Sequence, residues 1–195
     1  MRYPNGEEYV SPKKKEKKIN LRASLSSANR GMSLEADINE SNEYYKDKGI
    51  CLITKRPTPI NVVKVDYSRG AIITNAYFEK QSTTDYNGVY KSRYIDFEAK
   101  NTKNKTSFPL ANISPHQIEH LKQVRIHGGI AFFIVEFQTQ KKVFLLDAQY
   151  VIDYYEHGER KSIPYECFLK EGIEIIQGLN PSLDDIKAVE EKYFK

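Results

Sequence analysis

Apolar residues recur at helical spacing in some stretches of the chain, and in alternation or unbroken runs in others. Helical spacing predicts helices over residues 29–48, 115–127 and 148–156, a short one near Tyr165, and a last one capped by Ser182. Period-two or continuous apolar runs predict strands over residues 50–54, 61–67, 71–78, 90–100, 130–137 and 142–146. Because helices and strands are interspersed, this order favours an α/β fold over an all-β fold.

Short local signals indicate how these elements begin, end and connect. Ser114-Pro115 is typical of a helix start and Gly128-Gly129 of a helix stop. The apolar run 130–137 is continuous enough to lie centrally in a sheet that is covered on both faces. Tyr86-Asn87-Gly88 is typical of a hairpin turn, which we expect to return the chain beside itself before the strand 90–100.

Two prolines interrupt the chain after the strand 50–54. Pro57 and Pro59 prevent regular pairing there, because proline has no backbone N–H to donate. The strands 61–67 and 71–78 are joined around Ser68-Arg69-Gly70 and predict a β ribbon. We expect it to project as a stalk of about residues 55–80, inserted into the main domain.

The composition bounds the domain count and the location of the protein. The chain has 195 residues, of which 39% are hydrophobic, enough for one domain with a core, assigned here to residues 29–195. No apolar run approaches the roughly 20 residues of a membrane span, and no signal-peptide pattern follows the charged N-terminus. We therefore expect a soluble, cytoplasmic protein. Cys51 and Cys167 lie in apolar surroundings without a C-x-x-C pair, so we expect small buried hydrophobic residues.

Positive charge is concentrated at the N-terminus. The formal net charge of the chain is +4, and residues 1–28, with seven basic and three acidic side chains, account for all of it. This segment has no apolar period, so we expect a disordered arm. A basic arm on a neutral body suits a polyanionic partner, because lysines near phosphates release counterions, although solvated basic tails without such a role are also common.

The strand 90–100 and the segment before it carry a candidate catalytic pattern. Side chains alternate between the faces of a strand, so Glu98 and Lys100 point to the same side. The expected turn after Asp85 would bring a second carboxylate near Glu98. Two close carboxylates without a thiol favour Mg²⁺ or Mn²⁺ over zinc. Phosphodiester hydrolysis uses such a cluster, with a Lewis acid at the phosphoryl group and a cation such as Lys100 facing the developing charge.

An isolated E-x-K pattern is weak evidence, because it usually marks a solvated strand face. Longer motifs, however, resemble the RecU family of Holliday junction resolvases from about Asn29 to Lys195. The motifs that carry the resemblance are Asn29-Arg-Gly-Met-Ser-Leu-Glu35, Lys55-Arg-Pro-Thr-Pro59, Ser82-Thr-Thr-Asp-Tyr-Asn-Gly88, Tyr94-Ile-Asp-Phe-Glu-Ala-Lys100, and Phe108-Pro-Leu110 with His116-Gln-Ile118.

The RecU resemblance implies a restriction-endonuclease-like fold of the PD-(D/E)xK kind, with a mixed central sheet flanked by helices. It implies nicking of two opposing strands of a four-way DNA junction with Mg²⁺, which Mn²⁺ can replace. It also implies a lysine at Lys100 that stabilises the transition state. A two-fold homodimer would match the two equivalent strands, and RecU-like proteins are also associated with the RecA recombinase and branch-migration helicases. The metal ligands that the resemblance implies are Thr83, Asp85, Glu98 and Gln117.

Basic and aromatic residues in and near the expected stalk are candidates for DNA contacts, because basic side chains hold phosphates and aromatic rings stack on splayed bases. In RecU the corresponding region resembles a stalk that enters the centre of a four-way junction. An ordinary hairpin with core aromatics is the competing interpretation. The candidates there are Lys55, Arg56, Lys64, Arg69, Tyr77 and Phe78. Arg30, at the start of the first expected helix, is a further candidate for a contact with the DNA backbone.

Other functions and roles stay open at this point. The same fold serves restriction-type enzymes that cut duplex DNA, and a branched-DNA binding or annealing factor would need no metal site. Glu35 on the first helix has either a role near the metal or an exposed surface role. His116 and His120 have the spacing of two zinc ligands on a helix, but no third ligand is evident, so we expect no zinc site.

Overall fold

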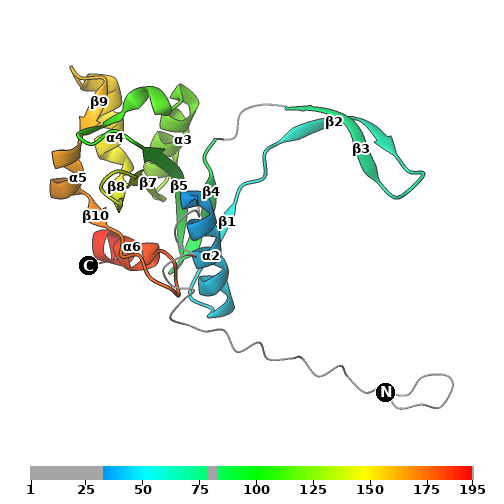
Figure 1. The fold of residues 1–195 in the computed structure, drawn as a ribbon, viewed down its shortest axis with the longest axis horizontal. Helices are drawn as coiled ribbons and strands as arrows, with labels where there is room; N and C mark the ends of the chain where they lie inside the picture. Colours follow the sequence, from blue (N-terminus) through cyan, green and yellow to red (C-terminus); the bar gives the residue numbers. More distant parts are fainter. Residues whose placement is uncertain (1–32, 79–82, 195) are drawn as a thin grey trace, which may run out of the picture. The chain divides into compact units, whose positions relative to one another are not determined.

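A computed structural model of the chain describes residues 33–78 and 83–194. The main sheet of this part consists of β1 (Leu52–Lys55), β4 (Tyr86–Tyr90), β5 (Arg93–Thr102), β7 (Ile130–Phe137), β8 (Lys142–Asp147) and β10 (Ile173–Glu174). These six described strands lie in the order β1-β4-β5-β7-β8-β10 (Figure 1). β5 and β7 pair in parallel, whereas the other neighbours pair antiparallel, so the sheet is mixed.

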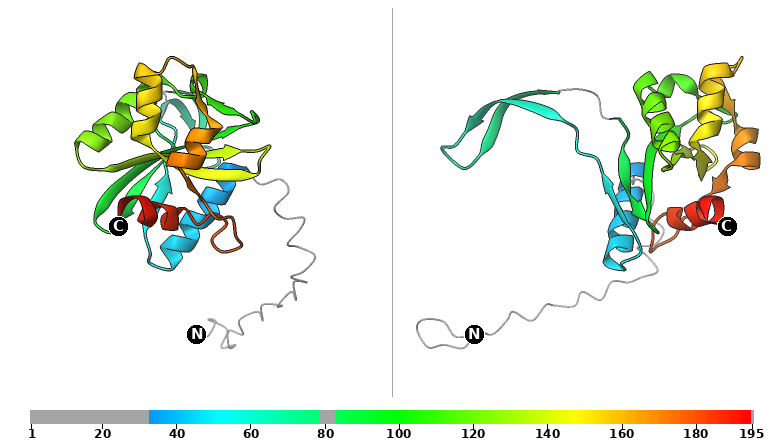
Figure 2. Two further views of the ribbon diagram at one scale, coloured as in Figure 1. Left: turned by 90° about the vertical axis from the view of Figure 1, so that its left-hand side faces the viewer. Right: turned by 180° about the vertical axis from the view of Figure 1, so that it is seen from behind.

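Helices cover both faces of this sheet. They are α2 (Leu34–Asp47), α3 (Pro115–Ile126), α4 (Ala148–His157), α5 (Tyr165–Glu171) and α6 (Asp185–Tyr193). Helices α2 and α6 pack against one buried core, and α3, α4 and α5 against a second core on the opposite face (Figure 2). A short 3-10 turn (Leu110–Asn112) and the paired strands β6 (Ser107–Pro109) and β9 (Ser162–Pro164) adjoin the second core. The predicted α/β fold with a mixed central sheet flanked by helices is confirmed.

The central position of β7 follows from its sequence. Alternate side chains of β7 enter the two cores, and seven of its eight residues are buried. A strand covered on both faces needs apolar side chains throughout, and the continuous run supplies them. The prediction of a central strand is confirmed.

The predicted hairpin turn at Tyr86-Asn87-Gly88 is wrong. These residues lie within β4, and the turn into β5 occurs at Lys91 and Ser92, whose φ angles are 45° and 62°. Gly88 is needed for another reason, because a Cβ atom at this position would lie 2.0 Å from the backbone oxygen of Leu52 on β1. Glycine here permits close approach of two strands, which a sequence signal for turns does not distinguish from a turn.

The ends of two helices test the capping predictions. Helix α3 begins as predicted, with a capping box in which the backbone N–H of Ser114 donates to Gln117 Oε1 at 3.0 Å, and it ends before Gly128 at φ 81°. The last helix differs, because Asp184 precedes α6 at the N-cap position. Ser182 does not cap it, and its hydroxyl donates to Glu40 at 2.6 Å.

A separate antiparallel ribbon is inserted between β1 and β4. It consists of β2 (Ile60–Asp66) and β3 (Ile72–Phe78), which confirms the two strands predicted after the prolines. All residues of β3 and most of β2 are exposed. The expected arm, residues 1–28, and Arg30 lie outside the described residues. Within the described ranges, no helix combines the length and apolar character needed to cross a membrane.

Candidate active site

One face of β5 carries the polar residues of the candidate site. Alternation along the strand places Tyr94, Asp96, Glu98 and Lys100 on the face toward α3, while the residues between them enter the core under α2 and α6. Asp96 and Glu98 are 0% and 1% exposed. Because burying a carboxylate is costly without compensating partners, the neighbours of each group determine its charge state.

Glu98 is surrounded by hydrogen-bond donors. Its Oε1 atom accepts from Lys100 Nζ at 2.7 Å and from Gln117 Nε2 at 2.6 Å, and its Oε2 atom accepts from the backbone N–H of Asp85 at 3.1 Å. Burial raises the pKa of the Glu98 carboxyl to about 7, against the lowering effect of Lys100, and the charge of Asp85 adds to the rise. Lys100 therefore does not fully offset the cost of a negative charge at Glu98.

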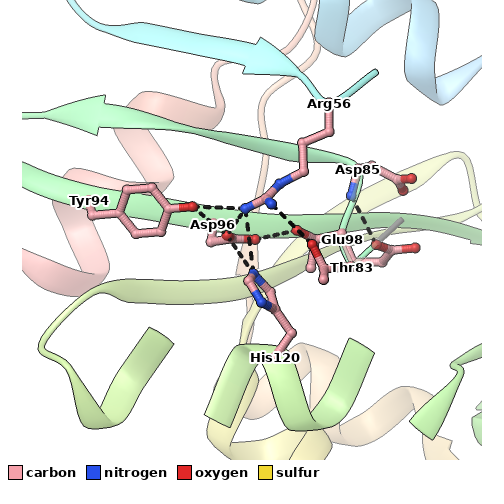
Figure 3. Close-up of polar contacts among 8 residues, drawn as sticks. Arg56, Thr83, Asp85, Tyr94, Asp96, Glu98 and His120 are labelled. Carbon is pink, nitrogen blue, oxygen red and sulfur yellow. Dashed lines mark hydrogen bonds and ion pairs between the residues drawn. The ribbon is translucent and has the colours of Figure 1, made fainter. Parts of the chain in front are cut away.

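Asp85 reaches Glu98 through the pairing of β4 with β5. Tyr86 lies opposite Phe97, so the residue before it, Asp85, lies beside Glu98. Asp85 Oδ2 accepts from the backbone N–H of Ala99 at 3.2 Å. The backbone N–H of Asp85 donates to Glu98, as drawn in Figure 3. The structure brings these two carboxylates together by strand register, and not by the predicted hairpin turn.

The side chains of Asp85 and Glu98 offer carboxylate oxygens as metal ligands, which suits a hard divalent cation such as Mg²⁺. No group of three or more His, Cys, Asp and Glu side chains that could hold a metal ion occurs within residues 33–78 and 83–194. A cation at this position would therefore depend on two carboxylates together with neutral oxygens. The raised pKa of Glu98 supports the fit, because a nearby cation would relieve the cost of the buried negative charge.

The two neutral ligands implied by the resemblance, Thr83 and Gln117, are both engaged with other groups. Thr83 Oγ1 accepts from Arg56 Nη1 at 3.0 Å. Gln117 presents its amide nitrogen to Glu98, and its amide oxygen accepts the capping bond from Ser114. To meet a cation beside Glu98 through its oxygen, the Gln117 amide would have to rotate and give up this capping bond.

A second polar network surrounds Asp96 (Figure 3). Asp96 Oδ2 accepts from the Tyr94 hydroxyl at 2.8 Å and lies 2.8 Å from His120 Nε2. The Arg56 guanidinium pairs with the same oxygen, and Thr84 Oγ1 donates to Oδ1. Burial alone would raise the pKa of Asp96, but the hydrogen bonds from His120, Thr84 and Tyr94 and the charge of Arg56 hold it below the usual value. Asp96 is thus an ionised and well-partnered carboxylate.

The sequence predictions omit Asp96, although alternation along the strand 90–100 places it on the same face as Glu98 and Lys100. They treat His120 only as a zinc candidate, yet its position three residues after Gln117 puts both side chains on one side of α3. They assign Arg56 to DNA binding. The structure turns its guanidinium toward Asp96 and leaves 23% of its side chain exposed.

The other residues predicted to contact DNA differ in their surroundings. Lys55 ends β1 and pairs with Glu35 of α2, which gives Glu35 an ion-pair partner at the protein surface. Tyr77 and Phe78 are 60% and 74% exposed, so the interpretation of these rings as core residues of a hairpin is wrong. Four candidates lie exposed on the ribbon, namely Lys64, Arg69, Tyr77 and Phe78.

Comparison with known proteins relates the chain to one family. Residues 29–191 match the family described as "RecU: Recombination protein U". The Holliday junction resolvase RecU of Geobacillus kaustophilus (strain HTA426) is 48% identical over 199 residues, which cover 100% of this chain and 98% of the relative. The Holliday junction resolvase RecU of Shouchella clausii (strain KSM-K16) is 49% identical, with 100% and 95% covered. A solved structure of Archaeoglobus fulgidus Hjc, a Holliday junction resolvase, matches 68% of this chain and 93% of its own at 14% identity, with a TM-score of 0.39.

Proposed function

Because this chain belongs to the RecU family, we propose that it is a Holliday junction resolving endonuclease of DNA recombination and repair. Its relatives at 48% and 49% identity bear the name Holliday junction resolvase RecU. The observation that carries the proposal is the convergence of Asp85, Glu98 and Lys100 on one face of the main sheet. The substrate is a four-way DNA junction, and the reaction hydrolyses a phosphodiester bond on each of two opposing strands.

Divalent metal chemistry fits the oxygen donors of this site. Asp85 and Glu98 are the charged ligands we propose for Mg²⁺, which Mn²⁺ would replace, and Thr83 and Gln117 are the neutral ones. The bound cation supplies Lewis-acid activation of the phosphodiester and of water. Lys100 holds a positive charge 2.7 Å from Glu98, so it is placed to stabilise negative charge that develops on the phosphoryl group beside these carboxylates.

The exposed ribbon is the junction-binding element in this proposal. The rings of Tyr77 and Phe78 stack on or separate bases at the branch point, because they are large, apolar and open to solvent. Basic side chains hold the phosphates on either side. The proposed phosphate contacts are Arg30, Lys55, Lys64 and Arg69.

The proposed assembly is a two-fold homodimer in the cytoplasm, which presents one site to each of the two strands. A sedimentation experiment with a junction checks it, since a complex of one protein chain per junction would contradict the dimer. RecA and a branch-migration helicase are the proposed protein partners. Pull-down with the purified components tests them, and absence of binding to both would remove this part of the proposal.

Cleavage of a synthetic four-way junction in Mg²⁺ tests the central proposal. Wild-type protein is expected to cut two opposing strands, and Asp85→Ala to lower the rate by about 10³-fold, because one of two charged ligands is lost. Junction binding in Ca²⁺ should change by less than about threefold, since binding rests on phosphate and ribbon contacts. Equal cutting by both proteins would overturn the proposal.

Two control outcomes separate the remaining functions. A linear duplex of the same sequence should be cut far more slowly than the junction, and cutting of the duplex at a defined sequence would indicate a restriction-type enzyme. Junction binding by the wild-type protein without any cleavage in Mg²⁺ or Mn²⁺ would indicate a non-catalytic DNA-binding factor.

A further inference from the structure

The ribbon leaves and re-enters the main sheet at two points that meet beside the candidate active site. The chain leaves the sheet at Arg56, directly after β1, and the described chain resumes at Thr83, shortly before β4. Arg56 Nη1 donates to Thr83 Oγ1 at 3.0 Å, and the backbone N–H of Arg56 donates to the backbone oxygen of Asp85 at 2.8 Å. Arg56, at one end of the ribbon insertion, is therefore bonded to Thr83 at the other end and to Asp85. Thr83 and Asp85 are two of the proposed metal ligands.

Asp96 anchors this arrangement from β5. Its Oδ2 atom pairs with Arg56 Nη2, and the same nitrogen donates to the Tyr94 hydroxyl at 2.8 Å. Its Oδ1 atom accepts from Thr84, the middle residue of the segment 83–85. Each residue of this segment is thus bonded either to Arg56 or to Asp96, as Figure 3 shows for Thr83.

We propose that Arg56 is a positioning residue, which with Asp96 holds the segment 83–85 in register against β5 and links the base of the ribbon to the candidate metal site. We call the pair of Arg56 and Asp96 the clasp. The inference rests on the proposed function of the site. The sequence predicts a direct DNA contact for Arg56. In this proposal Arg56 acts instead by positioning Thr83 and Asp85.

The chemistry of arginine suits this task better than that of lysine. The planar guanidinium donates from Nη1 to Thr83 and from Nη2 to Asp96 at the same time, with a fixed angle between the two directions. A lysine ammonium would keep a positive charge beside Asp96, but it would not fix the position of Thr83 relative to Asp96. Because Asp96 is fully buried and its Oδ2 atom pairs with the guanidinium, it holds Arg56 inward and away from an approaching phosphate.

Mn²⁺ binding by the full-length, DNA-free protein tests the clasp without relying on cleavage. Free Mn²⁺ is measured by electron paramagnetic resonance for wild type, Arg56→Met, Lys64→Met and Asp85→Ala, and junction binding is measured in Ca²⁺ for the same proteins. Arg56→Met is expected to lower Mn²⁺ affinity by about tenfold or more, the usual cost of losing a group that orients metal ligands. Its junction affinity should change by less than about threefold.

Lys64→Met is the matched control, because it removes one positive charge from the ribbon itself. It should weaken junction binding and leave Mn²⁺ affinity unchanged, the reverse of Arg56→Met. Arg56→Lys distinguishes positioning from mere stability. It should restore the melting temperature, because the charge beside Asp96 is kept, but not the Mn²⁺ affinity.

Mn²⁺ affinity decides the outcome. Wild-type affinity in Arg56→Met, together with weakened junction binding, would overturn the clasp and identify Arg56 as a DNA contact. If Arg56→Met does not fold, Arg56→Lys takes its place, and wild-type Mn²⁺ affinity in that variant overturns the clasp equally. If Asp85→Ala binds Mn²⁺ as the wild type does, the proposed metal site itself fails. If Asp85→Ala loses Mn²⁺ binding while Arg56→Met keeps wild-type affinity, the proposed metal site stands and only the clasp is refuted.

Discussion

The two halves of the polar face of β5 hold one buried carboxylate each, and their surroundings differ. In the first half, Asp96 is bonded to Arg56, Thr84 and Tyr94 and lies against His120, and its pKa is held below the usual value. In the second half, burial raises the pKa of Glu98 to about 7 despite Lys100. Both side chains come from one strand and are almost fully buried. The difference therefore comes from the neighbours that the ribbon base and α3 supply.

This contrast separates a structural carboxylate from one that is suited to bind a cation. A carboxylate that already has its partners stabilises the fold and gains little from further positive charge. A carboxylate whose ionisation is costly is strongly stabilised by a nearby divalent cation, because the cation offsets that cost. We therefore expect isosteric amide substitutions of the two groups to have opposite effects on stability.

Glu98→Gln should have the largest effect, with activity and stability moving in opposite directions. Junction cleavage in Mg²⁺ should fall by about 10³-fold, because one of the two proposed charged ligands becomes a neutral amide. The free energy of unfolding should rise by about 1 kcal/mol above pH 7, because a buried charge of raised pKa is removed. Cleavage assays and urea unfolding measure the two effects. If Glu98→Gln is less stable than the wild type at pH 8, the charge of Glu98 is not costly to the fold and the proposed difference from Asp96 is wrong.

The pH dependence of the increased stability of Glu98→Gln follows from the direction in which the pKa of Glu98 is shifted. The unfolded chain releases the Glu98 proton near the usual value of 4.5, whereas the folded protein keeps it until about pH 7. Between these values the folded state binds more protons, so this group lowers wild-type stability as the pH rises. The advantage of Glu98→Gln should therefore be absent near pH 4 and complete above pH 7.

Asp96→Asn should have the next largest effect, with the opposite sign. Removing this charge leaves Arg56 without its carboxylate, so the free energy of unfolding at pH 7 should fall by about 3 kcal/mol. Because the pKa of Asp96 is lowered in the folded state, its contribution is present above the usual value of 3.8 and is lost as the pH falls through the folded pKa. Tyr94→Phe, which removes one neutral partner of Asp96, is the control and should cost about 1 kcal/mol. Equal losses in the two variants would show that the charge of Asp96 is unimportant.

The part of the fold that local patterns determine was predictable from the sequence. The unbroken run 130–137 predicts a strand covered on both faces, and it occupies the centre of the main sheet. Alternation along 90–100 places Glu98 and Lys100 on one face, because side-chain direction in a strand depends only on sequence spacing. The same rule applied to Asp96 would have placed it beside them.

Features that depend on distant partners were not predictable in this way. Gly88 reads as a turn residue, but the backbone of β1, more than thirty residues earlier in the chain, is what requires it to be glycine. The sequence predicts a DNA contact for Arg56, since nothing near it in the sequence shows that a buried aspartate lies against it. The contacts of Arg56 depend on how β1, β4 and β5 pair, and that register is a property of the assembled sheet.

Anomalous diffraction from crystals soaked in Mn²⁺ would locate a bound cation on the polar face of β5. We expect an Mn²⁺ peak bonded to carboxyl oxygens of Asp85 and Glu98, with the Asp96 network unchanged beside it. Mn²⁺ bound at Asp96, or absent from the space between residues 85 and 98 while present elsewhere on the protein, would contradict this expectation.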